Sequence, residues 1–110
     1  MSISDRYRSL ADDINAFVAS QKKQINKDSS PELNQALRSV SKGYQIVDEL
    51  REGVGEIPRI RLEDDLTPIL MKAHNNLDRG RLAFLDAEDE KSAVAVWELQ
   101  QTIYRLLNDL

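Results

Sequence analysis

His74 is the only histidine of the chain, and an imidazole can bind a metal, accept a phosphoryl group or act as a general base. Each of these roles needs further groups at defined spacings. A di-iron or di-manganese bundle requires Glu-x-x-His pairs, a thiolate site requires cysteine, and a hydrolase triad requires a serine beside a histidine and a carboxylate. The chain has no cysteine, no Glu-x-x-His pair and no Gly-x-Ser-x-Gly turn. We therefore expect no metal, no cofactor, no small-molecule substrate and no enzyme activity.

Neighbouring carboxylates are the second candidate for chemistry, and they occur at Asp12-Asp13 and Asp64-Asp65. Adjacent side chains on a helix point in different directions, and acidic residues at a helix start favour the helix dipole. These pairs therefore indicate solvated surface and capping rather than general acid–base catalysis.

The segment around the histidine reads His74-Asn75-Asn76-Leu77-Asp78. A helical chain of this size with one histidine resembles a histidine phosphotransfer domain, and the resemblance implies that His74 would accept the phosphoryl group. Such domains place Lys and Gly after the histidine, as His-x-x-Lys-Gly, where this chain has Leu77 and Asp78. The alternative is a histidine on a helix flank, roughly 80° from the core stripe at about 100° per residue.

Four stretches of the chain repeat apolar residues at spacings of three and four, which is the pattern of a buried helix face. The repeating positions are, in chain order, Ile3, Tyr7, Leu10, Ile14 and Phe17; Leu33, Leu37, Val40, Tyr44 and Val47; Leu66, Leu70, Ala73, Leu77 and Phe84; and Ala93, Val96, Ile103 and Leu107. They predict helices over residues 3–26, 31–53, 64–85 and 87–109. Ser30-Pro31 has the composition of an N-cap followed by a first helical residue.

The residues between these stretches predict how the helices begin and end. Asp86-Ala87-Glu88-Asp89 predicts an N-cap and an acidic first turn for the last helix. The glycines, proline and alternating apolar residues of Gly55–Arg61 predict an extended connector. Pro68 is expected in the first turn of the third helix, because proline is tolerated there. Gly80, inside that helix, costs about 1 kcal/mol relative to Ala and indicates a kink or a close helix contact.

Helices of matched length joined by short turns pack against their neighbours in antiparallel order. We therefore predict that residues 1–110 form one all-α domain, an antiparallel up-down-up-down four-helix bundle. Gln21, Arg51 and Gln100 fall on the core stripes and would fix the register of the helices. We expect the Tyr44 hydroxyl and the Gln100 amide to hydrogen-bond in one middle layer, and Arg51 to extend to water.

The charge of the chain limits its partners and its location. Fifteen Lys and Arg against nineteen Asp and Glu give a net charge of -4, the wrong sign for neutralising phosphates, so no nucleic-acid binding is expected. The N-terminal residues are polar, and no run of about 18 apolar residues occurs, so we expect no membrane insertion and a cytoplasmic location.

The last two predicted helices carry more apolar residues than one core requires. The stripe of the last helix is roughly 180° wide, where a surface helix commonly needs little more than about 100°. The surplus residues are Trp97, Leu99, Tyr104 and Leu106 in that helix and Met71, Leu82 and Leu85 in the one before. Such a patch marks an interface with a partner or a second copy. The alternative is that wide stripes flank a core in which each helix contacts two neighbours.

The sequence thus predicts a small, non-enzymatic protein–protein interaction or regulatory bundle that self-associates as a homodimer. In size and helix number the predicted bundle is similar to bacteriocin immunity proteins. That resemblance implies a toxin-immunity or antitoxin role as an alternative. A histidine phosphotransfer domain is the third hypothesis.

Overall fold

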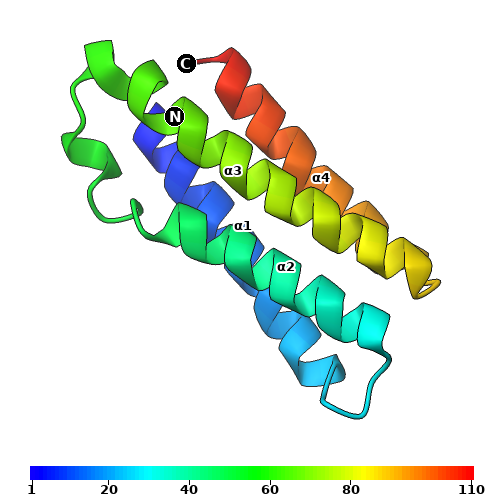
Figure 1. Ribbon diagram of the computed structural model, residues 1–110. Coiled ribbons are helices and arrows are strands. Elements are labelled where there is room, and N and C mark those ends of the chain that lie inside the picture. Colours follow the sequence, from blue (N-terminus) through cyan, green and yellow to red (C-terminus); the bar gives the residue numbers. More distant parts are fainter.

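The computed structural model describes residues 1–110 and consists of four packed helices with no strand (Figure 1). The elements are α1 (Ile3–Gln24), α2 (Pro31–Asp48), the short 3-10 helix η1 (Val54–Glu56), α3 (Arg59–Asp86) and α4 (Glu90–Asn108). Consecutive helices run antiparallel, and the two chain ends lie at the same end of the bundle (Figure 1). There Arg6 pairs with Asp109 at 2.7 Å. The all-α four-helix bundle predicted from the sequence is confirmed.

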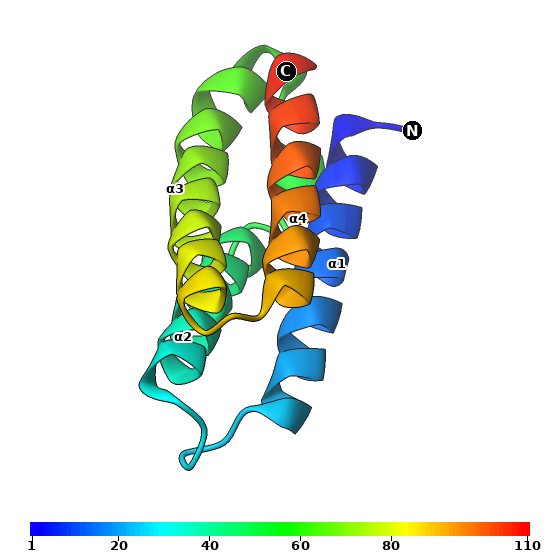
Figure 2. The ribbon, with the colours of Figure 1, turned by 90° about the vertical axis from the view of Figure 1, so that its right-hand side faces the viewer.

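The arrangement of the helices decides which faces are covered. Figure 2 shows α4 with α3 on one side and α1 on the other, while α2 lies behind. α2 packs against α1 and α3, and α4 packs against α3 and α1, so α2 and α4 are diagonal and not in contact. Twenty buried apolar residues from all four helices and η1 form one core. Each helix therefore buries one broad stripe and leaves the opposite face to solvent.

Side chains cap the N-termini of α2 and α4. The Ser30 hydroxyl accepts a hydrogen bond from the Leu33 N–H at 3.2 Å, with Pro31 in the first turn of α2. The Asp89 carboxylate accepts one from the Ser92 N–H at 3.1 Å and caps α4. These bonds satisfy backbone N–H groups that have no partner inside the helix. The N-cap predicted at Ser30 is confirmed, whereas the last helix begins at Glu90 rather than at residue 87, so that Asp89 is its N-cap and Asp86 still belongs to α3.

The second helix is shorter than predicted and the third is longer. α2 ends at Asp48 rather than near residue 53, because turns and η1 carry the fully buried Val54 back into the core. α3 begins at Arg59, so the expected extended connector over Gly55–Arg61 is wrong. Pro68 consequently lies inside α3 rather than in its first turn. Proline removes one backbone hydrogen bond there, and because Pro68 is exposed, water can reach the free carbonyl.

Candidate functional site

Six large apolar side chains remain exposed on two adjacent helices, and we call this surface the α3–α4 face. It consists of Met71, Leu82 and Leu85 on α3 and Val94, Trp97 and Tyr104 on α4. Helical periodicity puts each set of three on one side of its helix. The exposed fraction is 49% for Trp97 and 56% for Val94. Elsewhere in the chain, the only large apolar residues exposed to this degree are Met1 and Ile60.

A shallow pocket of about 450 Å³ lies at one end of this face. It is lined by Arg81, Leu85, Glu90, Ala93, Val94 and Trp97. The guanidinium carbon of Arg81 lies 5.8 Å from the centroid of the Trp97 ring, within the range of a cation–π contact. Most of the pocket lining is therefore apolar, with one cation, Arg81, and one carboxylate, Glu90. The contact with Arg81 also holds the Trp97 indole in place.

A polar seam between α3 and α4 runs beneath the face. The Gln100 amide nitrogen donates to Asp78 Oδ1 at 3.1 Å and lies 3.2 Å from His74 Nε2. Arg81 donates to the same Asp78 oxygen from Nε at 3.2 Å and from Nη2 at 3.0 Å. The hydrogen bond from Gln100 is the main cause of a lowered Asp78 pKa, which partial burial opposes and Arg81 and His74 reinforce. The Tyr104 ring packs edge-on against the imidazole, with centroids 4.8 Å apart.

This seam gives His74 a structural position. If the Gln100 amide donates to Nε2, the imidazole is neutral and carries its proton on Nδ1. Phosphoryl transfer to Nε2 would require breaking the contact with Gln100, and the incoming anion would meet the Asp78 carboxylate. The arrangement favours a structural role for His74 on the flank of α3 over a role as phosphoryl acceptor.

The expected hydrogen bond between Tyr44 and Gln100 is wrong. Gln100 faces α3, whereas Tyr44 lies on α2, which is diagonal to α4. Burial and the neighbouring Asp48 raise the pKa of the Tyr44 hydroxyl. Gln21, the other polar residue on a core stripe, is buried and donates from its amide to the Ser92 hydroxyl at 3.1 Å.

Two residues predicted to lie in the interaction surface do not belong to it. Leu106 is only 1% exposed and is part of the core, and Leu99 is half-buried against it. Leu99 lines a small depression with Phe17, between α4 and α1. Their margin of the stripe faces α1, so the core uses it, whereas the Trp97 and Tyr104 margin stays exposed. The alternative explanation, that a wide apolar stripe packs against two neighbouring helices, therefore holds for the Leu99 and Leu106 margin. It does not hold for the Trp97 and Tyr104 margin, which stays exposed.

Sequence reasoning missed one member of the face, Val94. A second series with spacings of four and three runs along α4 at Glu90, Val94, Trp97, Gln101 and Tyr104, all exposed except the half-buried Gln101. Its mixed composition concealed it, because only three of the five residues are apolar. Searching for a second heptad series, rather than for the width of the first, would have found it.

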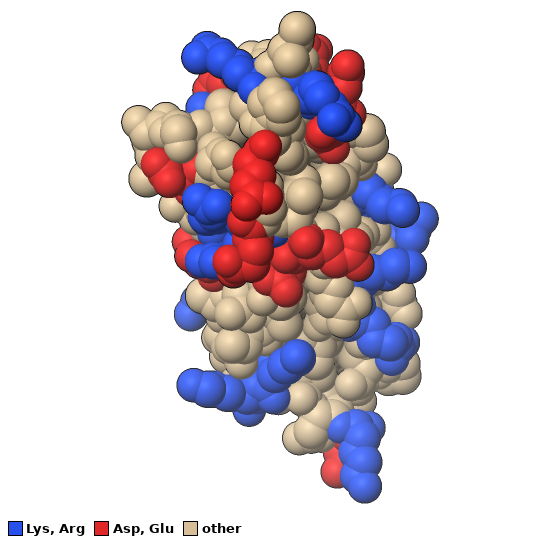
Figure 3. All heavy atoms as spheres, turned by 90° about the vertical axis from the view of Figure 1, so that its left-hand side faces the viewer, with Lys and Arg blue, Asp and Glu red and all other residues tan.

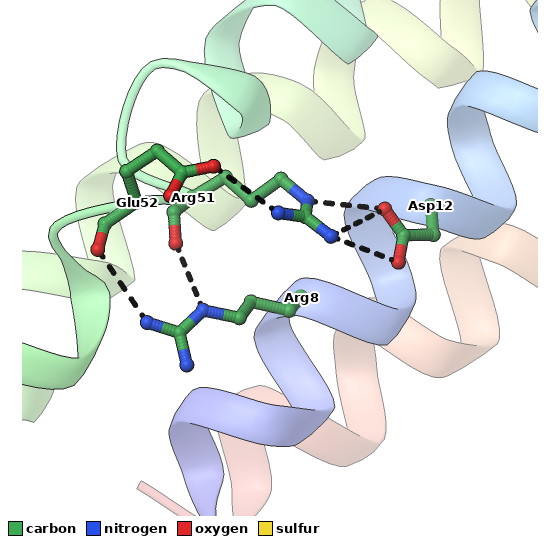
Figure 4. Close-up of polar contacts among 4 residues, drawn as sticks. All are labelled: Arg8, Asp12, Arg51 and Glu52. Carbon is green, nitrogen blue, oxygen red and sulfur yellow. Dashed lines mark hydrogen bonds and ion pairs between the residues drawn. The ribbon is translucent and has the colours of Figure 1, made fainter.

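The side of the molecule that carries η1 has a different character (Figure 3). Acidic and basic side chains mix there, with an acidic band across the middle. Arg51 reaches this surface and binds both Asp12 oxygens, at 3.0 and 3.1 Å, and Glu52 at 3.3 Å (Figure 4). Arg8 donates to the backbone carbonyls of Arg51 and Glu52, at 3.1 and 3.4 Å. These contacts fasten the turn after α2 to α1 and explain the cluster structurally.

No group of three or more His, Cys, Asp or Glu side chains is placed to hold a metal ion. None of the helices has the length and apolar character needed to span a bilayer. No protein-family model, curated protein or solved structure matches the chain. The feature that calls for an explanation is the exposure of six large apolar side chains on one face.

Proposed function

We propose that the chain is a small, non-enzymatic protein that works by binding another protein through the α3–α4 face. The supporting observation is the distribution of exposed apolar residues: six of the eight large ones lie on this face. Contiguous apolar patches of this kind mark interaction sites on soluble proteins. Residue types enriched at interfaces are present in it as Trp97, Tyr104 and Met71, and Arg81 lines the pocket at its end.

The geometry also favours tight binding over incidental exposure. Side chains that are already held in place lose little conformational freedom when a partner docks. Trp97 is held by Arg81, and Tyr104 by His74, before any partner arrives. Both lie on helices anchored by the Gln100 seam rather than on mobile loops. These two aromatic residues are the expected energetic centre of the interface.

The proposal covers two kinds of partner. A toxin bound by an immunity or antitoxin protein is one special case of this proposal, and a second copy of the chain is another. Both would use the same exposed residues, so the surface can be tested before the partner is known.

The test compares variants of the face with a matched variant outside it. Trp97→Ala and Leu82→Glu are expected to reduce recovery of cross-linked partners from cells of the source organism by at least tenfold. Ile60→Glu is the control, because Ile60 is apolar and even more exposed, at 89%, but lies at the start of α3. Circular dichroism would establish that all three variants fold. Unchanged partners in both face variants would contradict the proposed function.

A further inference from the structure

We propose that the outer side of the α2–α3 pair binds an acidic segment of another protein. The binding surface consists of four exposed cations, Arg38 and Lys42 on α2 and Lys72 and Arg79 on α3, and we call it the basic face. None of these residues belongs to the α3–α4 face. The inference therefore goes beyond the proposed function and does not depend on it.

Carboxylates are almost absent from the two stretches that carry the basic face, although the whole chain has a net charge of -4. Residues 33–47 of α2 contain no Asp or Glu. Residues 66–85 of α3 contain only Asp78, which accepts hydrogen bonds from Gln100 and Arg81. Together the two stretches carry five Lys or Arg against that one carboxylate, so the chain concentrates positive charge here.

The four cations of the basic face form no ion pair. Two other arginines of α3, Arg61 and Arg81, each pair with a carboxylate three or four residues away. At those spacings the basic face has only uncharged residues or another cation. Arg38 and Lys42 are themselves four residues apart, and like charges at that spacing destabilise a helix. A carboxylate at the exposed Gln45 would relieve this repulsion without disturbing the core, so the fold does not require the unpaired charge.

Close packing of α2 against α3 brings the cations to one side of the pair. A Cβ atom on Gly43 of α2 would lie 3.4 Å from the Ala73 carbonyl oxygen of α3, so these residues face each other. Lys42 and Lys72 come one position before them in the chain. In antiparallel helices, residues that precede two facing residues by one position project to the same side, because each is turned about 100° from the contact.

The other two cations lie on the same side. Gly80 of α3 faces Val40 of α2, and Arg79 comes one position before Gly80. Arg38 lies one turn of α2 before Lys42. Figure 3 shows the α2–α3 side at its right-hand edge, where basic side chains follow one another along the bundle. The four charges thus form one continuous surface.

The length of the basic face and the charges at its ends favour a short acidic segment. Lys72 and Arg79 are seven residues apart, about 10 Å at 1.5 Å per residue, which an extended chain spans with about three residues. Carboxylates limit the face at both ends, with Glu32 and Asp86 at one and Glu49 at the other. A membrane surface or a nucleic-acid duplex would bring its phosphates close to these carboxylates as well. A peptide with three or four adjacent acidic residues fits between them.

Fluorescence anisotropy with a labelled peptide tests the proposal on the whole chain. The probe contains four consecutive Glu residues, and a peptide with four Gln residues is its neutral counterpart. The wild-type chain is expected to bind the Glu peptide at low salt, and the Gln peptide about tenfold more weakly or less. The affinity should fall as salt is added, because the contacts are between exposed charges. No binding of the Glu peptide, or equal binding of the two peptides, would overturn the proposal.

A pair of charge reversals locates the site. Lys42→Glu combined with Lys72→Glu is expected to weaken binding of the Glu peptide by about tenfold or more. Lys22→Glu combined with Lys23→Glu is the matched control, because it makes the same change of net charge at exposed lysines in the last turn of α1. The control should keep its affinity within about twofold. Equal losses in the two double variants, with both folded by circular dichroism, would show that only net charge matters and would overturn the site.

Two further probes separate the classes of partner. A DNA duplex and vesicles of phosphatidylcholine with phosphatidylserine are offered under the same conditions. Tighter binding of either one than of the Glu peptide, lost in the same double variant, would overturn the assignment to an acidic protein. Trp97→Ala should bind the Glu peptide as the wild type does, because Trp97 lies on the α3–α4 face. A loss of binding in that variant would place the peptide on the α3–α4 face and overturn the basic face.

Discussion

Gly80 of α3 lies so close to Val40 of α2 that a Cβ atom on the glycine would be 2.5 Å from Val40 Cγ1. The same Cβ would lie 3.4 Å from the Ala36 carbonyl oxygen, so the backbone of α2 is also near. A close helix contact, one of the two explanations that the sequence leaves open for this glycine, is therefore what the structure shows. The contact fixes α3 against α2 and leaves the other side of α3 for α4 and solvent.

Gly80→Ala is therefore expected to destabilise the fold, although alanine is the better helix former by about 1 kcal/mol. Overpacking of this kind costs roughly 1–3 kcal/mol, which exceeds the gain in helix propensity. Urea unfolding measures the difference. In a Val40→Ala background, where Cγ1 is absent, the same substitution should cost less. A Gly80→Ala chain more stable than the wild type would contradict the described contact.

Tyr7 is fully buried, and its hydroxyl donates to the Val47 carbonyl at 2.7 Å, which joins α1 to α2. Tyr7→Phe removes this donor, while the Val47 carbonyl keeps a longer hydrogen bond of 3.3 Å from the Leu50 N–H. The expected loss is therefore that of one hydrogen bond, about 0.5–1.5 kcal/mol in the free energy of unfolding at neutral pH. An unchanged unfolding midpoint in urea would show that the bond contributes nothing.

The same tyrosine predicts how stability falls in alkali. Burial, with Asp48 and Glu49 nearby, raises the pKa of Tyr7 far above its ordinary 10.0. Because the folded pKa exceeds the unfolded one, this contribution is complete below pH 10.0 and is lost as the pH rises from there towards the folded pKa. Unfolding measured between neutral pH and the alkaline range should therefore show a shallower decline for Tyr7→Phe than for the wild type. Parallel curves would contradict this assignment.

Asp78 predicts the opposite behaviour in acid. Its lowered pKa means that its contribution is present above the ordinary value of 3.8 and is lost as the pH falls through the folded value. Gln100→Met removes the main hydrogen-bond donor, so the Asp78 pKa should rise when followed by NMR titration of the carboxyl carbon. Asp78→Asn should flatten the acid limb of the stability profile. An Asp78 pKa unaffected by Gln100→Met would assign the shift to Arg81 instead.

Glu88 offers a substitution that should stabilise the chain. It has a φ of 60° in the turn between α3 and α4, where the Asp89 N–H bonds to the Phe84 carbonyl at 2.9 Å. A left-handed residue costs roughly 1–2 kcal/mol unless it is glycine. Glu88→Gly should raise the free energy of unfolding by about 0.5–1 kcal/mol after the entropy cost of glycine. Glu90→Gly, in the first turn of α4, is the control and should destabilise.

Local signals predicted the elements of this fold well, and the misses have physical causes. Ser30 and Asp89 cap helices because capping depends on a few adjacent residues. The early start of α3 and the interior Pro68 were not predictable from propensity, because tertiary packing and an exposed carbonyl allow a proline there. Tertiary context also decided which margin of the α4 stripe is exposed, since only the packed structure shows that Leu106 lies in the core.

The polar seam shows the same limit. Gln100 was recognisable as a polar residue on a core stripe, but its partners His74 and Asp78 come from α3. Their side of α3 looked solvent-facing in the sequence. Finding the pairing needed the register of α3 against α4, which the lengths of the connecting turns do not define to a single residue.

The accessibility of Trp97 tests the central claim most directly, because it is the only tryptophan of the chain and lies on the α3–α4 face, in the lining of its pocket. Acrylamide quenching of its fluorescence would be measured in the dilute chain and in the complex, either with a second copy or with a cross-linked partner. The account predicts a clear fall in quenching and a shift of emission to shorter wavelength in the complex. Equal quenching and unchanged emission in the two states would contradict it.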